Sequence, residues 1–181
     1  LEVEVDALIP VALPWLGEPE AEAARRPIMS GWVMQGPEVA AFEAEFAAYV
    51  GARHACAVSS CTTALHLGLL AVGVRPGDEV ITASHSFVAT ANSVRYCGAK
   101  PVFVDVQPGT FNIDPKLIER AITPSTRAIL CVHQIGMPCD DFVRRVRYPD
   151  QRALKLFIRI AHRFEQRSMR SSFQAVLDYV T

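Results

Sequence analysis

The sequence of 181 residues lacks any run of about 18 uncharged apolar residues, so no segment of it resembles a membrane span. It also lacks an excess of one charge, because 18 Lys and Arg face 19 Asp and Glu. A chain this close to neutral gives no electrostatic sign of a nucleic-acid partner. The acidic stretch 1–6 argues against a secretory signal. We therefore expect a cytoplasmic protein with neither a membrane nor a nucleic-acid partner.

Metal-binding and disulfide patterns are missing as well. The five cysteines are odd in number and include no Cys-x-x-Cys pair, and the five histidines are scattered. Structural zinc needs closely spaced pairs of ligands. Free thiols in a reducing compartment are the expectation, with no metal site.

Glycine is absent from residues 141–181, although residues 1–140 contain all 10 glycines. The charge reverses at the same point, from a net −6 before it to a net +5 after it. A change of this size within one small chain indicates a boundary. We assign residues 1–140 to one domain and residues 141–181 to an unrelated Arg-rich tail. A shifted reading frame and a genuine replacement both remain open as the origin of this tail.

Short apolar runs alternate with helix-like stretches in residues 1–140. The runs at 55–59, 80–83, 101–106 and 128–132 predict strands, and the stretches at 62–72, 88–96 and 114–122 predict helices. Strands that alternate with helices in this way imply a parallel sheet with flanking helices, the α/β class.

Two further helices are predicted outside that alternation. Gly36-Pro37 opens one and Gly51 ends it, since Pro suits the first helical position and Gly suits the residue after the last. In the tail, apolar residues from Leu154 to Phe164 have helical spacing, so we expect a divergent helical tail.

Two segments that follow predicted strands are candidate binding sites, because ligands gather at the carboxyl ends of parallel strands. Ser59–Leu65 opens a helix whose unpaired N–H groups suit a phosphate, and Thr62 and Thr63 can add hydroxyl donors. A plain helix cap is the alternative. The segment 84–87 ends in Phe87, an aromatic that can cover a flat ring or, alternatively, fill the core.

These residues stand in an ordered set that resembles the nucleotide-sugar aminotransferase family, a DegT-like branch of the fold-type I enzymes that depend on pyridoxal phosphate. The matching stretches are Ser30-Gly31-Trp32, Gly36-Pro37-Glu38-Val39, Ser60-Cys61-Thr62-Thr63-Ala64-Leu65, Gly77-Asp78-Glu79-Val80-Ile81, Phe87-Val88-Ala89-Thr90, Gly98-Ala99-Lys100-Pro101-Val102-Phe103-Val104-Asp105, Asn112-Ile113-Asp114-Pro115 and Val132-His133. The resemblance implies part of the large domain of that fold.

The resemblance also implies roles for particular residues. Thr62 and Thr63 match the segment that binds the cofactor phosphate, with Cys61 in place of the usual Gly or Ala, and Phe87 matches the aromatic that stacks on the pyridine ring. Trp32 and Gly36 match a loop near the sugar nucleotide. His133 matches a strand-end histidine, for which a structural role in a turn is the alternative.

The intact relatives transfer an amino group from an amino acid to a keto-sugar nucleotide in polysaccharide biosynthesis, and their sites lie at a dimer interface. The resemblance requires an Asp against the pyridine nitrogen and a Schiff-base lysine, and no matching motif follows residue 140. None of Lys100, Lys116 and Lys155 matches that lysine. We thus expect a truncated, catalytically inactive member without covalently bound cofactor.

One alternative is a non-catalytic module for pyridoxal phosphate or nucleotide binding, or for dimerisation. The other is a relative of the sugar dehydratases, in which His replaces Lys, although the context of His162 does not match.

Overall fold

A computed structural model describes residues 14–139, 157–162 and 173–178. The chain divides into two compact units, Leu1–Ala57 and Val58–Thr181. No helix among the described residues is both long enough and apolar enough to cross a membrane.

The first unit contains two helices, α1 (Glu18–Ser30) and α2 (Pro37–Val50). The predicted helix after Gly36 is confirmed, and it ends at Gly51, whose φ of 71° is a conformation that favours glycine. Helix α1 was not predicted. Arg26 Nε and Nη2 each donate to one carboxylate oxygen of Glu38, at 3.1 Å, and tie the two helices together.

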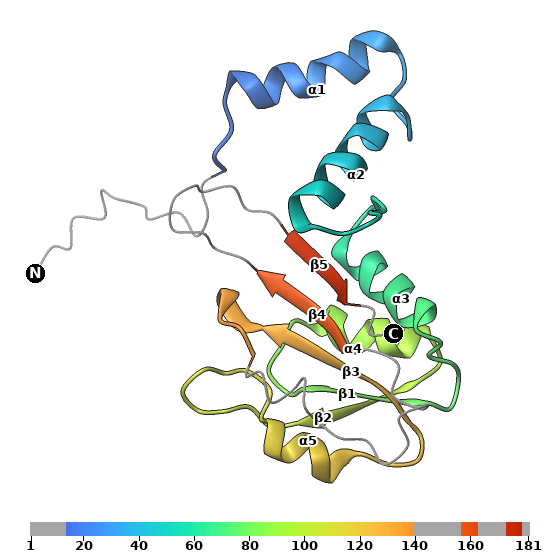
Figure 1. Ribbon diagram of the computed structural model, residues 1–181, viewed down its shortest axis with the longest axis vertical. Coiled ribbons are helices and arrows are strands. Elements are labelled where there is room, and N and C mark those ends of the chain that lie inside the picture. Colours follow the sequence, from blue (N-terminus) through green and yellow to red (C-terminus); the bar gives the residue numbers. More distant parts are fainter. Residues whose placement is uncertain (1–13, 140–156, 163–172, 179–181) are drawn as a thin grey trace, which may run out of the picture. The chain divides into compact units, whose positions relative to one another are not determined.

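The second unit is an α/β layered domain, as the sequence predicts (Figure 1). Its elements are, in order, α3 (Cys61–Ala71), β1 (Glu79–Ala83), α4 (Val88–Tyr96), β2 (Lys100–Val104), α5 (Pro115–Ala121), β3 (Thr126–His133), the short 3-10 turn η1 (Gln134–Gly136), β4 (Phe157–His162) and β5 (Phe173–Asp178). The sheet has the order β2-β1-β3-β4-β5, with β5 antiparallel to β4 and the other neighbours parallel.

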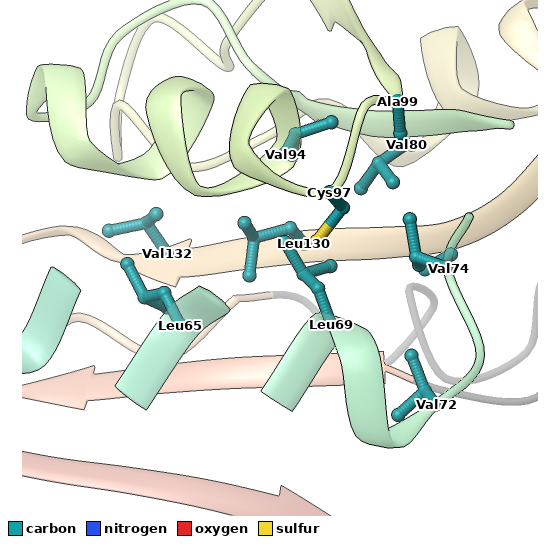
Figure 2. Packing of buried hydrophobic residues seen from close by; sticks show 11 residues of the cluster. Leu65, Leu69, Val72, Val74, Val80, Val94, Cys97, Ala99, Leu130 and Val132 are labelled. Carbon is teal, nitrogen blue, oxygen red and sulfur yellow. The ribbon is translucent and has the colours of Figure 1, made fainter. Parts of the chain in front are cut away.

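Each face of the sheet buries its own apolar cluster. On one face Leu65 and Leu69 of α3 and Val94 of α4 pack over Val80 and Leu130 (Figure 2). On the other, Ile118 of α5 belongs to the cluster that contains Ile81 and Ile129. Successive residues of β1 and β3 thus point to opposite faces, as the two-residue repeat of a strand requires. These two layers fix the strands whose ends carry the candidate site.

Two predicted elements are wrong. Residues 55–59 form no strand; the Ala57 N–H donates to the Glu43 carboxylate at 2.7 Å instead of to a neighbouring strand. A strand needs a partner for its backbone groups, and within the described residues none lies beside this run.

The helical tail is the second error, because residues 157–162 form β4 instead. β4 pairs in parallel with β3 from Ile129↔Phe157 to His133↔Ala161. β3 is a central, almost wholly buried strand whose second edge needs hydrogen-bond partners. That requirement, with β-branched Ile158 and Ile160, outweighs the helical spacing of the apolar residues.

Candidate functional site

Three loops meet the same edge of the sheet. β1 ends at Ala83, β2 at Val104 and β3 at His133, and since the three strands are parallel, the loops after them lie at the carboxyl edge. α4 begins at this edge directly after the first loop. α3 also begins here, because its first buried residue, Leu65, lies beside Val132 near the end of β3 (Figure 2).

The first turn of α3 separates the roles of its two threonines. Thr63 is engaged within the cap: its N–H donates to Ser60 Oγ at 3.2 Å, and its hydroxyl lies 3.0 Å from the same oxygen. Among the residues that the structure describes, the Thr62 hydroxyl and the N–H groups of Cys61 and Thr62 have no hydrogen-bond partner. Three donors at a helix N-terminus are therefore free for an anion.

Cys61 is the first residue of α3, and its thiol is exposed. It occupies the position where the resemblance expects Gly or Ala. Its backbone N–H is one of the free donors just described, so the backbone geometry at this position is compatible with the predicted phosphate site.

Phe87 lies just before α4, and 78% of its surface is exposed. The alternative of a core position is therefore wrong. Its backbone is held on the α4 side, because Ser86 Oγ lies 2.8 Å from Thr90 Oγ1 and the Thr90 N–H donates to the Phe87 carbonyl at 3.0 Å. An exposed ring on a fixed backbone is suited to stacking on a flat ligand.

His133 is a structural histidine of the turn after β3. Its side chain is buried, and its Nδ1 accepts the Cys139 N–H at 2.8 Å. A nitrogen that accepts carries no proton, so the ring proton of the neutral imidazole lies on Nε2. Of the two sequence-based alternatives for His133, the structure supports the role in the turn.

Sequence reasoning missed a polar network that connects the three loops. Gln134 Nε2 lies 2.8 Å from His85 Nδ1 and donates to the His85 carbonyl at 2.8 Å. Asn112 is buried, accepts the Gln134 N–H at 2.9 Å and donates to the carbonyls of Met137 and Pro138 at 3.0 Å each. The one available signal was that Gln134 directly follows a strand.

Trp32 and Gly36 belong to the first unit and form one local motif. The Trp32 indole N–H donates to the Gln35 carbonyl at 2.8 Å. The ring lies over Gly36, where a Cβ atom would stand 2.6 Å from Trp32 Nε1. Glycine is needed at this position for the close approach of the ring.

Neither of the two lysines that the structure describes is part of the carboxyl edge. Lys100 begins β2 at the opposite, amino edge, where its Nζ lies 3.1 Å from Glu79 Oε1. Lys116 is exposed on α5, the helix on the other face of the sheet from α3 and α4. Lys155 lies outside the described residues.

The model of the DegT/DnrJ/EryC1/StrS aminotransferase family matches residues 14–164. The chain belongs to this family. The match runs past the boundary that composition places at residue 140, and that boundary itself stays a prediction.

Relatives of the family agree with the match. The spore coat polysaccharide biosynthesis protein SpsC of Bacillus subtilis is 50% identical over 132 residues, which are 73% of this chain and 34% of SpsC. Among solved structures, DesV of S. venezuelae superposes with a TM-score of 0.72 at 42% identity over 78% of this chain and 38% of its own. Spr1654 of Streptococcus pneumoniae, a sugar aminotransferase solved in its PLP form, has a TM-score of 0.80 at 29% identity over 85% and 43%.

This chain spans about a third of SpsC and about two fifths of the two solved proteins. The two solved proteins are fold-type I aminotransferases, which confirms the predicted fold class. Spr1654 is also known in a PMP form, so pyridoxal phosphate is the cofactor of the family, as the resemblance implies.

Proposed function

We propose that the carboxyl edge of this sheet holds the phosphate and the ring of pyridoxal phosphate, within a site for amino transfer to a sugar. The free donors at the start of α3 carry the proposal. Cys61 and Thr62 offer two backbone N–H groups and Thr62 a hydroxyl, all directed from a helix N-terminus that favours an anion. Phe87 offers an exposed ring on the same edge.

Each residue has a separate task in this site. Thr62 and the Cys61 N–H bind and orient the phosphate, while Ser60 and the main-chain N–H of Thr63 hold the turn in shape. Phe87 covers one face of the pyridine ring and keeps water from it. The cofactor, when bound, supplies the electron sink that amino transfer requires.

The whole-protein activity is proposed from the family. The amino donor is an amino acid and the acceptor a keto-sugar nucleotide, bound with the help of Trp32 and Gly36 in a cytoplasmic homodimer. We expect no turnover by the 181-residue chain alone, since Lys100 pairs with Glu79 at the other edge of the sheet and Lys116 lies on the opposite face.

A binding titration of the full chain with pyridoxal phosphate tests the site. Thr62→Ala removes one of three donors, so we expect the affinity to fall by roughly ten- to a hundredfold, the worth of a hydrogen bond to a charged group. Thr63→Ala is the matched control, because its hydroxyl is already used within the cap. We expect it to change the affinity by less than about twofold.

Two results would contradict the proposal. One is a wild-type chain that binds pyridoxal phosphate no better than an unrelated protein, and the other is equal loss from both threonine variants. Borohydride reduction of the complex followed by mass spectrometry tests the expectation of non-covalent binding. A stoichiometric adduct at a single lysine, together with turnover, would overturn it.

A further inference from the structure

The structure describes two non-glycine residues with a left-handed backbone, and both flank one side-chain contact. Phe111 has a φ of 56° and Ile135 a φ of 49°. A β-branched residue such as Ile135 rarely adopts this conformation, and strained residues persist only where the surroundings hold them. Between them lies the contact of Gln134 with His85, with the Phe111 and His85 rings 5.6 Å apart.

The distances determine which atoms donate and which accept in the contact between Gln134 and His85. The His85 carbonyl can only accept, so the group of Gln134 at 2.8 Å from it must be the amide NH₂. The second hydrogen of that NH₂ then points to His85 Nδ1, also at 2.8 Å, which must accept it. One amide group therefore holds both the main chain and the ring of His85.

The main chain of Gln134 is held by hydrogen bonds of its own turn and of a second loop. The buried Asn112 accepts the Gln134 N–H and donates to the carbonyls of Met137 and Pro138, which fixes the start and the end of the turn after β3. Asn112 also belongs to the loop after β2, where its own carbonyl accepts the Gln107 N–H at 2.9 Å. Gln134 thus reaches, from a main chain held by Asn112, across to the loop after β1.

We propose that Gln134 is a positioning residue for Phe87. By holding His85 at two points, it fixes the loop 84–87 and so sets where the exposed Phe87 ring lies at the carboxyl edge. This rests on the proposed function in so far as the ring is to cover the cofactor. The positioning itself is a property of the loop and can be measured without any ligand.

The experiment uses the full chain in three forms: wild type, Gln134→Met, and Gln107→Met as the matched control. Gln107 is a glutamine at the same edge whose side chain only accepts the Thr110 hydroxyl within its own loop, at 3.2 Å. Backbone ¹⁵N order parameters are measured for residues 84–87. We expect values near 0.85 in the wild type and the control, falling towards about 0.6 in Gln134→Met, at an unchanged thermal unfolding midpoint.

Titrations with pyridoxal phosphate and with inorganic phosphate separate the ring from the phosphate. Gln134→Met is expected to weaken pyridoxal phosphate by roughly fivefold and to leave inorganic phosphate within about twofold, because only the former uses Phe87. Gln134→Leu, which also loses both donors and adds no charge, should behave in the same way and guards against a packing defect of the Met variant.

The outcomes distinguish the positioning role of Gln134 from the proposed cofactor site. Unchanged order parameters at 84–87 in both Gln134 variants overturn the positioning role, whether or not the cofactor binds. A loosened loop with unchanged affinity for pyridoxal phosphate also overturns it, since Phe87 would then not depend on Gln134 for binding. If the wild type binds no pyridoxal phosphate, the proposed function fails, and a loosened loop in the variants still supports the positioning role.

Discussion

The two units of this chain differ in how they use apolar residues. In the sheet unit, apolar residues from three helices, three strands and the loops between them are buried in two clusters, and nine of them are fully inaccessible to solvent: Leu69, Val80, Val94, Ile81, Ile113, Ile118, Ala128, Ile129 and Leu130. In the helical unit the described residues include one buried side chain, Ala47, while Ile28, Met29, Phe42 and Tyr49 are each more than half exposed.

The residues that precede the helices also differ between the two units. In the sheet unit, two of the three helices have a capping side chain: Ser60 before α3 and Asp114 before α5 each accept a backbone N–H of the first turn, whereas Phe87 before α4 does not. α1 and α2 begin at Gly17 and Gly36, which have no side chain to do so. Helices gain most of their stability from packing of one face. The sheet unit therefore carries its own stability, and the helical unit depends more on local contacts such as Arg26 with Glu38.

The largest effect is expected from a core leucine of α3. Leu69→Ala should lower the free energy of unfolding by about 2–5 kcal/mol, because Leu69 is fully buried and its loss leaves a cavity between α3 and β3. Urea unfolding followed by circular dichroism measures it. Leu67, two residues earlier on the same helix, is 46% exposed, so Leu67→Ala should cost less than about 1 kcal/mol.

Phe42→Ala in α2 extends this comparison to the other unit. Phe42 is 55% exposed and contacts Phe46 at a ring distance of 5.8 Å, so we expect a loss near that of an exposed aromatic pair, about 1 kcal/mol. A loss as large as that of Leu69→Ala would show that the helical unit has a core of its own and would end the contrast between the two units.

The helix caps give the next effect in size. Ser60→Ala removes the acceptor of the Thr63 N–H and should lower the free energy of unfolding by about 1 kcal/mol. Ser125→Ala is a suitable control, because this serine is exposed and the hydrogen bonds that the structure records for it involve its backbone. An equal effect of the two variants would remove the argument that side-chain caps distinguish the sheet unit.

Local sequence signals predict most of the sheet unit. The helices α3, α4 and α5 and the strands β1, β2 and β3 lie within two residues of their predicted ends, because apolar periodicity, Pro and Gly act over a few neighbours. Helix α1 was not predicted because it lacks these local signals. It buries no residue and contains Pro27, so it shows neither a clear apolar stripe nor an uninterrupted helical sequence.

The errors fall where partners far apart in the sequence decide the structure. The strand at 55–59 fails for lack of a neighbour, and β4 forms because β3 offers one. The same holds for the site. Thr62 and Phe87 could be found from their place after apolar runs, whereas Gln134 and His85 are 49 residues apart and meet only through the sheet.

A smaller effect is expected at the glycine under the Trp32 ring. Gly36→Ala places a methyl group where the indole now lies, 2.6 Å from Nε1, and should push the ring away and break its bond to the Gln35 carbonyl. Since Trp32 is 58% exposed, the ring can move outwards at a cost below about 1 kcal/mol.

Tryptophan emission measures this change in a Trp15→Phe background, which leaves Trp32 as the one tryptophan. We expect a shift to longer wavelength in Gly36→Ala, as the ring becomes more hydrated. Gly109→Ala, at a position with open space around it, is the control. An unchanged emission spectrum would mean that the ring does not lie over Gly36 in solution.

The smallest effect concerns two carboxylates whose pKa values are both lowered, one in each unit. The Thr123 hydroxyl, and after it Lys100, lower the pKa of Glu79, and the hydrogen bonds from Arg26 lower the pKa of Glu38. A lowered pKa in the folded state stabilises the protein above the unfolded value, about 4.3 for Glu, and this contribution is lost as the pH falls through the folded value. Glu79→Gln and Glu38→Gln should therefore lower stability at pH 7 and approach the wild type below about pH 4.

The side chain of Glu79 is 15% accessible and that of Glu38 49%, so solvent screens Glu38 more, and we expect the larger pH-dependent difference for Glu79. Urea unfolding at pH 7 and pH 3.5 measures the stability of both variants against the wild type. A larger pH-dependent difference for Glu38→Gln would mean that the exposed pair of Arg26 and Glu38, not the contacts of Glu79, carries the electrostatic stability.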